Sequence, residues 1–173
     1  MPGMEVDLGG IAKGYAIDRA ADALEKAGAT GGIVDIGHDL RLFGTNEEGG
    51  KWRVGVHRPP GVEKSLILEV GPCAVTTSGD YARGFMVGNK WFSHIIDPRT
   101  GRPATDVTSV TVVGPDATTA DALATALSVM GPEEGLALME GLQEFECLFM
   151  TRLARGAVEI KMSSGFDALL VED

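Results

Sequence analysis

The apolar residues near the start of the chain recur with the period of a helix. Between residues 17 and 27 they fall three or four positions apart, and Gly28 follows where helices commonly stop. The positions between them are charged, and the simplest interpretation is a face in contact with water. Its members are Asp18, Arg19, Asp22, Glu25 and Lys26. The pattern therefore predicts an amphipathic helix that ends at Gly28.

A second helical pattern lies in the last third of the chain. It predicts a helix over residues 120–130, for which Asp116 and Thr118 are the candidate N-caps. Another helix is predicted over residues 132–142, because Pro132 is tolerated in the first turn of a helix. These two helices follow each other with almost no loop between them.

Short alternating or wholly apolar runs predict strands in the rest of the chain. They cover residues 32–37, 38–44, 51–57, 65–70, 73–77, 81–87, 90–96, 107–113, 145–150 and 157–162. Residues 77–81 are predicted as a polar turn, and Gly88 with Asn89 as the link of a hairpin. We expect an α+β fold with a mostly antiparallel sheet and two or three flanking helices. Residues 1–173 are expected to form one domain.

Composition narrows the classes of partner. The chain of 173 residues has a formal net charge of −10, which argues against nucleic acid or an anionic membrane surface as the main partner. An acidic protein that handles a phosphate compound needs a metal ion or well-placed cations. No run reaches the roughly 20 apolar residues of a membrane span, and no signal peptide is recognisable. Cys73 and Cys147 lie outside any CxxC motif, so buried free thiols are the default, with a disulfide left open.

A glycine-rich turn precedes the first helix. Residues 7–16 read DLGGIAKGYA, and the glycine pair Gly9 and Gly10 would let backbone N–H groups approach a phosphate at the helix start. Lys13 follows, but the spacing of a P-loop is absent. A tight strand-to-helix turn without any ligand explains the glycines equally well.

The most informative stretch is residues 91–103, where an apolar strand ends in a turn. Asp97 opens an Asp-Pro-x-x-Gly turn that ends at Gly101, and the strand brings His94 close to it. Two interpretations of His94 are open. It is either a core histidine with a backbone partner, or a general base or positioning imidazole beside a carboxylate.

Two further pairs have similar alternatives. Ser78 and Asp80 belong to the polar stretch TSGDY, which is either a plain turn or a hydroxyl and a carboxylate displayed to a ligand. Asp121 and Thr125 are four residues apart on one helix face, where their oxygens could bind a hard cation. The plain alternative is an aspartate favoured by the helix dipole beside a neutral threonine.

Four blocks in this order resemble the ApbE family. They are DLGGIAKGYA at residues 7–16, TSGDY at 77–81, HIIDPRTG at 94–101 and ADALATAL at 120–127, and the resemblance spans residues 5 to about 140. The family comprises bacterial FAD:protein FMN transferases. The resemblance implies Mg²⁺-dependent transfer of FMN from FAD to a Thr or Ser hydroxyl of a partner protein, with release of AMP. Alternatives are hydrolysis of FAD to FMN and AMP, and FAD binding without catalysis.

The resemblance also implies roles for the residues in these blocks. Asp121 and Thr125 resemble the Mg²⁺ ligands, together with a backbone carbonyl near Gly10. Gly9, Gly10, Lys13, Ser78 and Asp97 would contact the FAD substrate. Ser78, Asp80 and His94 would line the active site, with His94 as base or orienter of the attacking hydroxyl and Asp97 shaping the corner. The acceptor would be a subunit of a membrane electron-transfer complex.

The chain also departs from the family pattern. Relatives are expected to be about twice as long, with a signal or lipobox in the additional N-terminal part, which implies a periplasmic, membrane-anchored full-length protein. Relatives usually have Gly-Gly-Asp where this chain has Gly37, His38 and Asp39. A bulky imidazole at that position is expected to alter the close approach of the backbone to the nucleotide.

Overall fold

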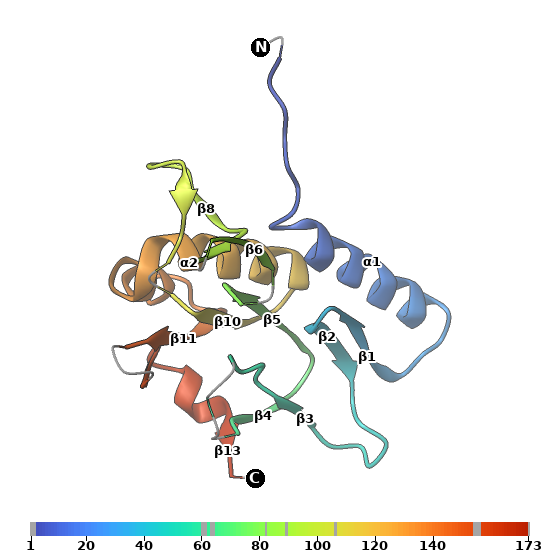
Figure 1. Cartoon of the computed structure of the whole chain (residues 1–173). Coiled ribbons are helices and arrows are strands. Elements are labelled where there is room, and N and C mark those ends of the chain that lie inside the picture. Colours follow the sequence, from blue (N-terminus) through green and yellow to red (C-terminus); the bar gives the residue numbers. More distant parts are fainter. Residues whose placement is uncertain are drawn as a thin grey trace.

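A six-stranded antiparallel sheet forms the centre of the computed structural model (Figure 1). The structure describes residues 3–59, 62, 65–81, 83–88, 90–105, 107–153 and 157–172. The strand order is β1-β2-β5-β10-β11-β12, and every neighbouring pair is antiparallel. The strands are β1 (Gly31–Ile36), β2 (Asp39–Gly44), β5 (Cys73–Gly79), β10 (Ser109–Gly114), β11 (Glu146–Arg152) and β12 (Val158–Met162).

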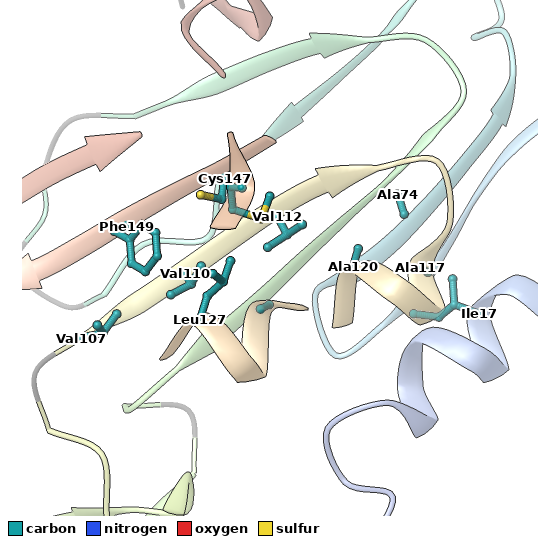
Figure 2. Packing of buried hydrophobic residues seen from close by; sticks show 12 residues of the cluster. Ile17, Ala74, Val107, Val110, Val112, Ala117, Ala120, Leu127, Cys147 and Phe149 are labelled. Atoms are coloured by element: carbon teal, nitrogen blue, oxygen red, sulfur yellow. The ribbon is translucent and has the colours of Figure 1, made fainter. Parts of the chain in front are cut away.

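Two helices cover one face of this sheet, α1 (Ala12–Lys26) and α2 (Ala117–Met139). Ile17 of α1 and Leu127 of α2 meet strand residues such as Val110 in one buried cluster, as Figure 2 shows. Helix α2 is interrupted at Gly131, whose φ of 81° breaks the helical backbone before Pro132. The two predicted helices are therefore present, joined end to end across a kink. Asp116 is the N-cap, since its side chain accepts the Thr119 N–H.

A second, smaller sheet covers the opposite face. It contains β3 (Trp52–Gly55), β4 (Ile67–Val70) and β13 (Leu170–Val171) in the order β13-β4-β3. Successive side chains of a central strand point to opposite faces of the sheet and so contribute to two separate cores. Phe149 faces the helices, while Leu148 and Met150 belong to the cluster beneath the second sheet. The 3-10 helix η2 (Phe166–Leu169) adds the fully buried Phe166 to that cluster. The sequence did not predict β13 or η2.

Two small hairpins lie at the end of the central sheet, formed by β6 (Gly84–Val87) with β7 (Lys90–Ser93) and by β8 (Ile96–Asp97) with β9 (Arg102–Pro103). The strands predicted over 81–87 and 90–96 are thus shorter than expected, and His94 follows β7 rather than lying in it. Asn89, predicted in the hairpin link, lies outside the described residues.

Two local predictions were wrong. Thr77, Ser78 and Gly79 belong to β5, because the pairing with β10 continues as far as Gly79 opposite Ser109. Asp18 was expected in water, but it is buried and accepts hydrogen bonds from the N–H groups of Ala117 and Thr118. The first N–H groups of a helix lack internal partners, so a carboxylate from α1 supplies them where the helices meet.

The predicted fold class is confirmed: mostly antiparallel sheet with flanking helices. Both cysteines are free, and burial raises the pKa of each thiol to about 11. Within the described residues, no helix combines the length and hydropathy that crossing a membrane requires.

Candidate functional site

The turn before α1 is fixed by its own hydrogen bonds. The Asp7 carboxylate accepts the Gly9 N–H at 2.7 Å, and the Leu8 carbonyl accepts the N–H groups of Ile11 and Ala12. Gly10 then lies against α2, where a Cβ on it would come within 3.0 Å of the Thr125 methyl carbon and 3.2 Å of its hydroxyl oxygen. The absence of a side chain at Gly10 therefore lets the backbone approach the Thr125 hydroxyl.

Helices α1 and α2 touch at Gly14 and Asp121. The Gly14 N–H donates to Asp121 Oδ2 at 3.0 Å, and Asp121 is 2% exposed. A Cβ on Gly14 would lie 2.1 Å from the Ala117 carbonyl oxygen. The contact thus requires glycine, and it places a buried carboxylate beside the start of α1, where the helix dipole favours negative charge.

Lys13 is shared by two buried carboxylates. Its Nζ forms an ion pair with Asp39 and lies 3.3 Å from Asp121 Oδ1. Asp39, at the start of β2, is fully buried and also accepts the Thr77 N–H at 2.9 Å. Burial raises the pKa of Asp39, while the hydrogen bond from Lys13 opposes that rise. One Lys13 ammonium group thus faces two carboxyl groups, and the three side chains carry a net negative charge when both carboxyl groups are ionised.

Ser78 completes this oxygen-rich cluster from β5. Its hydroxyl lies 3.3 Å from the Thr125 hydroxyl. The Asp121 carboxylate, the Thr125 hydroxyl and the adjoining Gly10 backbone offer oxygen ligands, which hard cations such as Mg²⁺ prefer. No group of three or more His, Cys, Asp or Glu side chains suited to a metal exists in the described part of the chain. A metal here would therefore depend on the hydroxyl and the backbone as well as on the single carboxylate.

Asp80 lies just beyond the end of β5. Its N–H donates to the Thr108 carbonyl, and its own carbonyl accepts the indole N–H of Trp91. Its Oδ1 is buried and has no hydrogen-bond partner among the described residues. Burial raises the pKa of Asp80, which the positive charge of Arg152 opposes. An unpartnered carboxyl oxygen with a raised pKa has the properties of a proton donor or acceptor.

His94 is exposed, so the interpretation as a core histidine was wrong. Its Nδ1 lies 2.9 Å from the Arg83 carbonyl oxygen. Because a carbonyl only accepts, Nδ1 carries the proton and Nε2 of the neutral ring keeps its lone pair. In the neutral ring, Nε2 is therefore the nitrogen that is able to accept a proton. Among the described contacts, none joins His94 directly to Ser78 or Asp121.

The corner is the turn over residues 97–101, and the side chain of Asp97 holds it together. Its carboxylate accepts both the N–H and the Nε–H of Arg99, which hold its pKa below the usual range. Arg99 in turn donates to the Val129 carbonyl and so ties the corner to α2. Gly101 exits the turn at a φ of 67°. The predicted turn is present; the predicted contact of Asp97 with a cofactor stays a prediction.

A groove of about 540 Å³ runs between this corner and α2. Gly10 and Thr125 line it together with Ile96, Arg99 and Met130. Its walls are mainly apolar, and the oxygen cluster adjoins them at Gly10 and Thr125. Such a groove can take a flat ring whose phosphate group reaches the polar residues.

The structure thus brings Gly10, Lys13, Ser78, Asp121 and Thr125 together, and their predicted roles as ligands stay predictions. Asp80 follows β5 and His94 follows β7, and none of their described hydrogen bonds is with this cluster. Gly9 has its N–H occupied by Asp7. Asp39 was not among the predicted site residues, although its position in the block Gly37-His38-Asp39 was a usable signal.

The chain is similar to named proteins over most of its length. A profile described as the ApbE family matches residues 1–149. The FAD:protein FMN transferase of Vibrio cholerae is 44% identical over 146 residues, covering 83% of this chain and 44% of that relative. The protein of the same name from Escherichia coli K12 is 34% identical over 178 residues, covering 100% of this chain and 50% of that relative. The chain therefore spans about half the length of these relatives.

Solved structures give the same result. The flavin transferase ApbE from Vibrio cholerae has 40% identity and a TM-score of 0.84, over 98% of this chain and 54% of that one. The ApbE protein from Thermotoga maritima has 38% identity and a TM-score of 0.87, over 99% of this chain and 55% of that one. With its four motifs, its antiparallel sheet and these matches, the chain belongs to the ApbE family.

Proposed function

We propose that the chain carries the site for Mg²⁺-dependent transfer of FMN from FAD to a Thr or Ser hydroxyl of a partner protein. The observation that carries this proposal is the meeting of the glycine turn with α2, which gathers Gly10, Lys13, Asp121 and Thr125. The similar proteins are named for FAD:protein FMN transfer. This chain spans about half the length of those proteins.

The ligands of the proposed metal are Asp121, Thr125 and the backbone carbonyl near Gly10. These are hard oxygen donors, and the cluster carries one cation against two carboxylates. When bound, Mg²⁺ would offset the charge of the FAD pyrophosphate and polarise its phosphorus. Lys13 contributes a second positive charge beside the same phosphates, while its bond to Asp39 holds its side chain in place.

Transfer requires a proton acceptor for the attacking hydroxyl. His94 Nε2 has the available lone pair, because Nδ1 is occupied by the Arg83 carbonyl. The hydroxyl oxygen forms a bond to the FMN phosphorus, the bond between that phosphorus and the bridging oxygen breaks, and AMP leaves with the electron pair. The hydroxyl proton passes to His94. Asp80, whose pKa burial raises, is the carboxyl that we propose to assist this proton transfer.

The acceptor is proposed to be a protein with an exposed Thr or Ser, of the kind found in subunits of membrane electron-transfer complexes. His94 is exposed, so a bulky acceptor segment can reach it. Water can reach the same residue, and hydrolysis of FAD to FMN and AMP is therefore the competing outcome.

Mass spectrometry tests this proposal. The chain is incubated with FAD, Mg²⁺ and an acceptor domain that carries a flavinylation threonine. We expect the acceptor to gain the mass of FMN while AMP is released. Free FMN with an unmodified acceptor would indicate hydrolysis, and intact FAD would reject catalysis by this chain.

Asp121→Asn tests the metal ligand in the same assay. The amide keeps the shape of the carboxylate but loses its charge, so we expect transfer to fall at least about 100-fold and to recover partly at high Mg²⁺. Asp22→Asn is the matched control, because Asp22 lies on α1 in a partly exposed pair with Arg19. Equal activity of the two variants would remove Asp121 from the site.

A further inference from the structure

The hairpin of β6 and β7 exposes large apolar side chains on both of its faces. The exposed fractions are 56% for Phe85, 57% for Met86, 57% for Val87 and 42% for Trp91. Phe85 and Met86 are neighbours in a strand and so point to opposite faces. The two cores, as far as the described residues define them, contain none of these four side chains. Exposed apolar side chains gathered in one place are typical of a surface that binds a partner.

The root of this hairpin is tied to both residues of the proposed proton transfer. The Arg83 carbonyl, directly before β6, accepts the His94 N–H at 3.3 Å and lies 2.9 Å from its Nδ1. The Trp91 indole donates to the Asp80 carbonyl at 2.9 Å, and its ring covers Gly84, where a Cβ would lie 2.6 Å from a ring carbon. The hairpin therefore starts at a fixed place beside His94 and Asp80.

The apolar side chains of β6 lie within a short reach of His94. Gly84 pairs with Ser93, the residue before His94, and Val87 pairs with Lys90 at the other end of the hairpin. At a rise of about 3.3 Å per residue, β6 extends roughly 10 Å from the level of His94. A partner segment of three or four residues that lies along β6 therefore reaches the imidazole.

One edge of β6 is open to a further strand. Among the described strands, β6 pairs with β7 alone, so its second edge can form backbone hydrogen bonds with an extended segment. A hairpin of two strands is marginally stable by itself, and a third strand adds to its stability. Alternate side chains of such a strand would lie beside Phe85 and Val87 on one face and beside Met86 on the other.

The charge around the hairpin is opposite in sign to that of the whole chain. Residues 83–103 contain four basic residues, Arg83, Lys90, Arg99 and Arg102, and one acidic residue, Asp97, whereas the chain has a net charge of −10. The three arginines are exposed, and Asp97 is paired with Arg99. A basic surface on an acidic protein favours a partner segment that contains acidic residues.

Two other occupants fit this surface less well. A second copy of the chain also has a net charge of −10, so the two copies repel each other at long range. An anionic membrane surface would meet the same repulsion, and it offers no strand to the open edge of β6.

We propose that the β6–β7 hairpin is the docking surface for the acceptor protein, whose segment around the attacked Thr or Ser lies along β6 as an extended strand. This inference rests on the proposed function, because the partner is the protein that presents the hydroxyl to His94. The reach of β6 places apolar residues of the acceptor within about four positions of that Thr or Ser. Acidic residues of the same segment lie near the exposed arginines.

Tryptophan fluorescence measures this docking without catalysis. The chain has two tryptophans, and Trp52→Phe leaves Trp91 on the hairpin as the single reporter. Phenylalanine suits position 52, because Trp52 Nε1 has no hydrogen-bond partner among the described residues. The variant is titrated, without FAD or Mg²⁺, with an acceptor domain that carries a flavinylation threonine and has no tryptophan. We expect a saturable change in Trp91 emission, with weaker binding at higher salt concentration. Absence of binding would overturn the proposal.

A double substitution on the hairpin tests the apolar contacts. Met86→Ser with Val87→Ser removes two exposed side chains that lie outside both cores. We expect this variant to bind the acceptor domain about tenfold or more weakly, because two apolar contacts are lost. Leu24→Ser with Leu138→Ser is the matched control, because these leucines are 46% and 40% exposed on the helices. Equal affinity of the two double variants would reject the hairpin as the docking surface.

Two control titrations identify the partner. Phosphatidylglycerol vesicles that change Trp91 emission, when the acceptor domain does not, would assign the hairpin to a membrane surface. An emission change that depends only on the concentration of the chain would assign it to a second copy. Either result would overturn the proposal.

FMN transfer is measured in parallel, so that the docking surface and the proposed function can fail separately. The KM for the acceptor should rise in the hairpin double variant by the same factor as the dissociation constant. Binding that depends on the hairpin, without any transfer, rejects only the proposed function. Transfer with the same KM in both double variants rejects the docking surface alone.

Discussion

Lys13 is the residue on which the charge balance of the site depends. It faces two carboxylates, Asp39 and Asp121, which are almost completely buried. Buried carboxylates are tolerated only with partners that replace their hydration. Asp39 is satisfied by Lys13 and the Thr77 N–H, and Asp121 by the Gly14 N–H as well. The site is therefore pre-arranged, and a bound cation would add to an arrangement that already exists.

His94→Ala should lower FMN transfer at least about 100-fold, because a general base typically contributes that much. FAD affinity should stay unchanged, since the described contacts of His94 are with Arg83. Transfer rate and FAD binding, the latter followed by flavin fluorescence, are measured separately. His94→Gln is the control that can keep the bond to the Arg83 carbonyl without a basic nitrogen. If it restored transfer, the role of His94 would be positional.

At the scale of elements, the α1–α2 contact is built from groups that each helix lacks. Asp18 of α1 supplies acceptors for the first N–H groups of α2, and Asp121 of α2 does the same for Gly14 of α1. Each helix thus satisfies the start of the other. The proposed metal ligand and the packing of the two helices depend on the same contact.

Gly14→Ala tests this coupling. The added methyl group would lie 2.1 Å from the Ala117 carbonyl oxygen, so the helices must separate. We expect a loss of about 2 kcal/mol or more in the free energy of unfolding, as for overpacked cores, measured by urea denaturation. Gly55→Ala is the control, because a Cβ there meets no atom within 4 Å. Equal unfolding midpoints would show that the contact has room for a side chain.

At the scale of the whole molecule, the sheet carries a core on each face. The helices cover one core and the sheet β13-β4-β3 the other. Turns and strand ends between these layers hold the candidate site and a cavity lined by His38 and His57. The stacked rings of His38, His57 and Tyr81 come from three such segments. Protonation of His57 therefore affects the stability of the fold.

The stability of the fold should depend on pH through His57. Burial lowers the pKa of His57 from 6.5, and the neighbouring His38 lowers it further. Below pH 6.5 the unfolded chain therefore takes up a proton that folded His57 still refuses. Stability should fall as the pH decreases from 6.5 to the lower pKa of the folded state, and this contribution stays constant above 6.5.

Thermal melts from pH 7.5 down to pH 5 measure this effect. His57→Gln keeps a polar partner for the Tyr81 hydroxyl but does not titrate, so its melting temperature should depend less on pH in this window. His94→Gln is the control at an exposed imidazole. Parallel curves for His57→Gln and the parent chain would contradict the proposed link.

Much of the fold follows from local patterns. The 3.6-residue period, Gly28, Asp116 and Pro132 mark where helices begin, end or kink, because these signals depend on the backbone of a few neighbouring residues. The Asp97 turn was predictable for the same reason. Residues 164–173 were not, since η2 and β13 are held by the burial of Phe166 beneath the second sheet.

The sequence by itself determined the family, most of the helices and strands, and the chemical types at the site, because motifs of short spacing contain that information. Only the tertiary structure decided that Asp18 is buried, that Asp39 shares Lys13 with Asp121, and that His94 is exposed. It also brought His38, His57 and Tyr81 into one column. Each of these facts joins residues that are distant in sequence, so it depends on how helices and strands pack against one another, which no local pattern records.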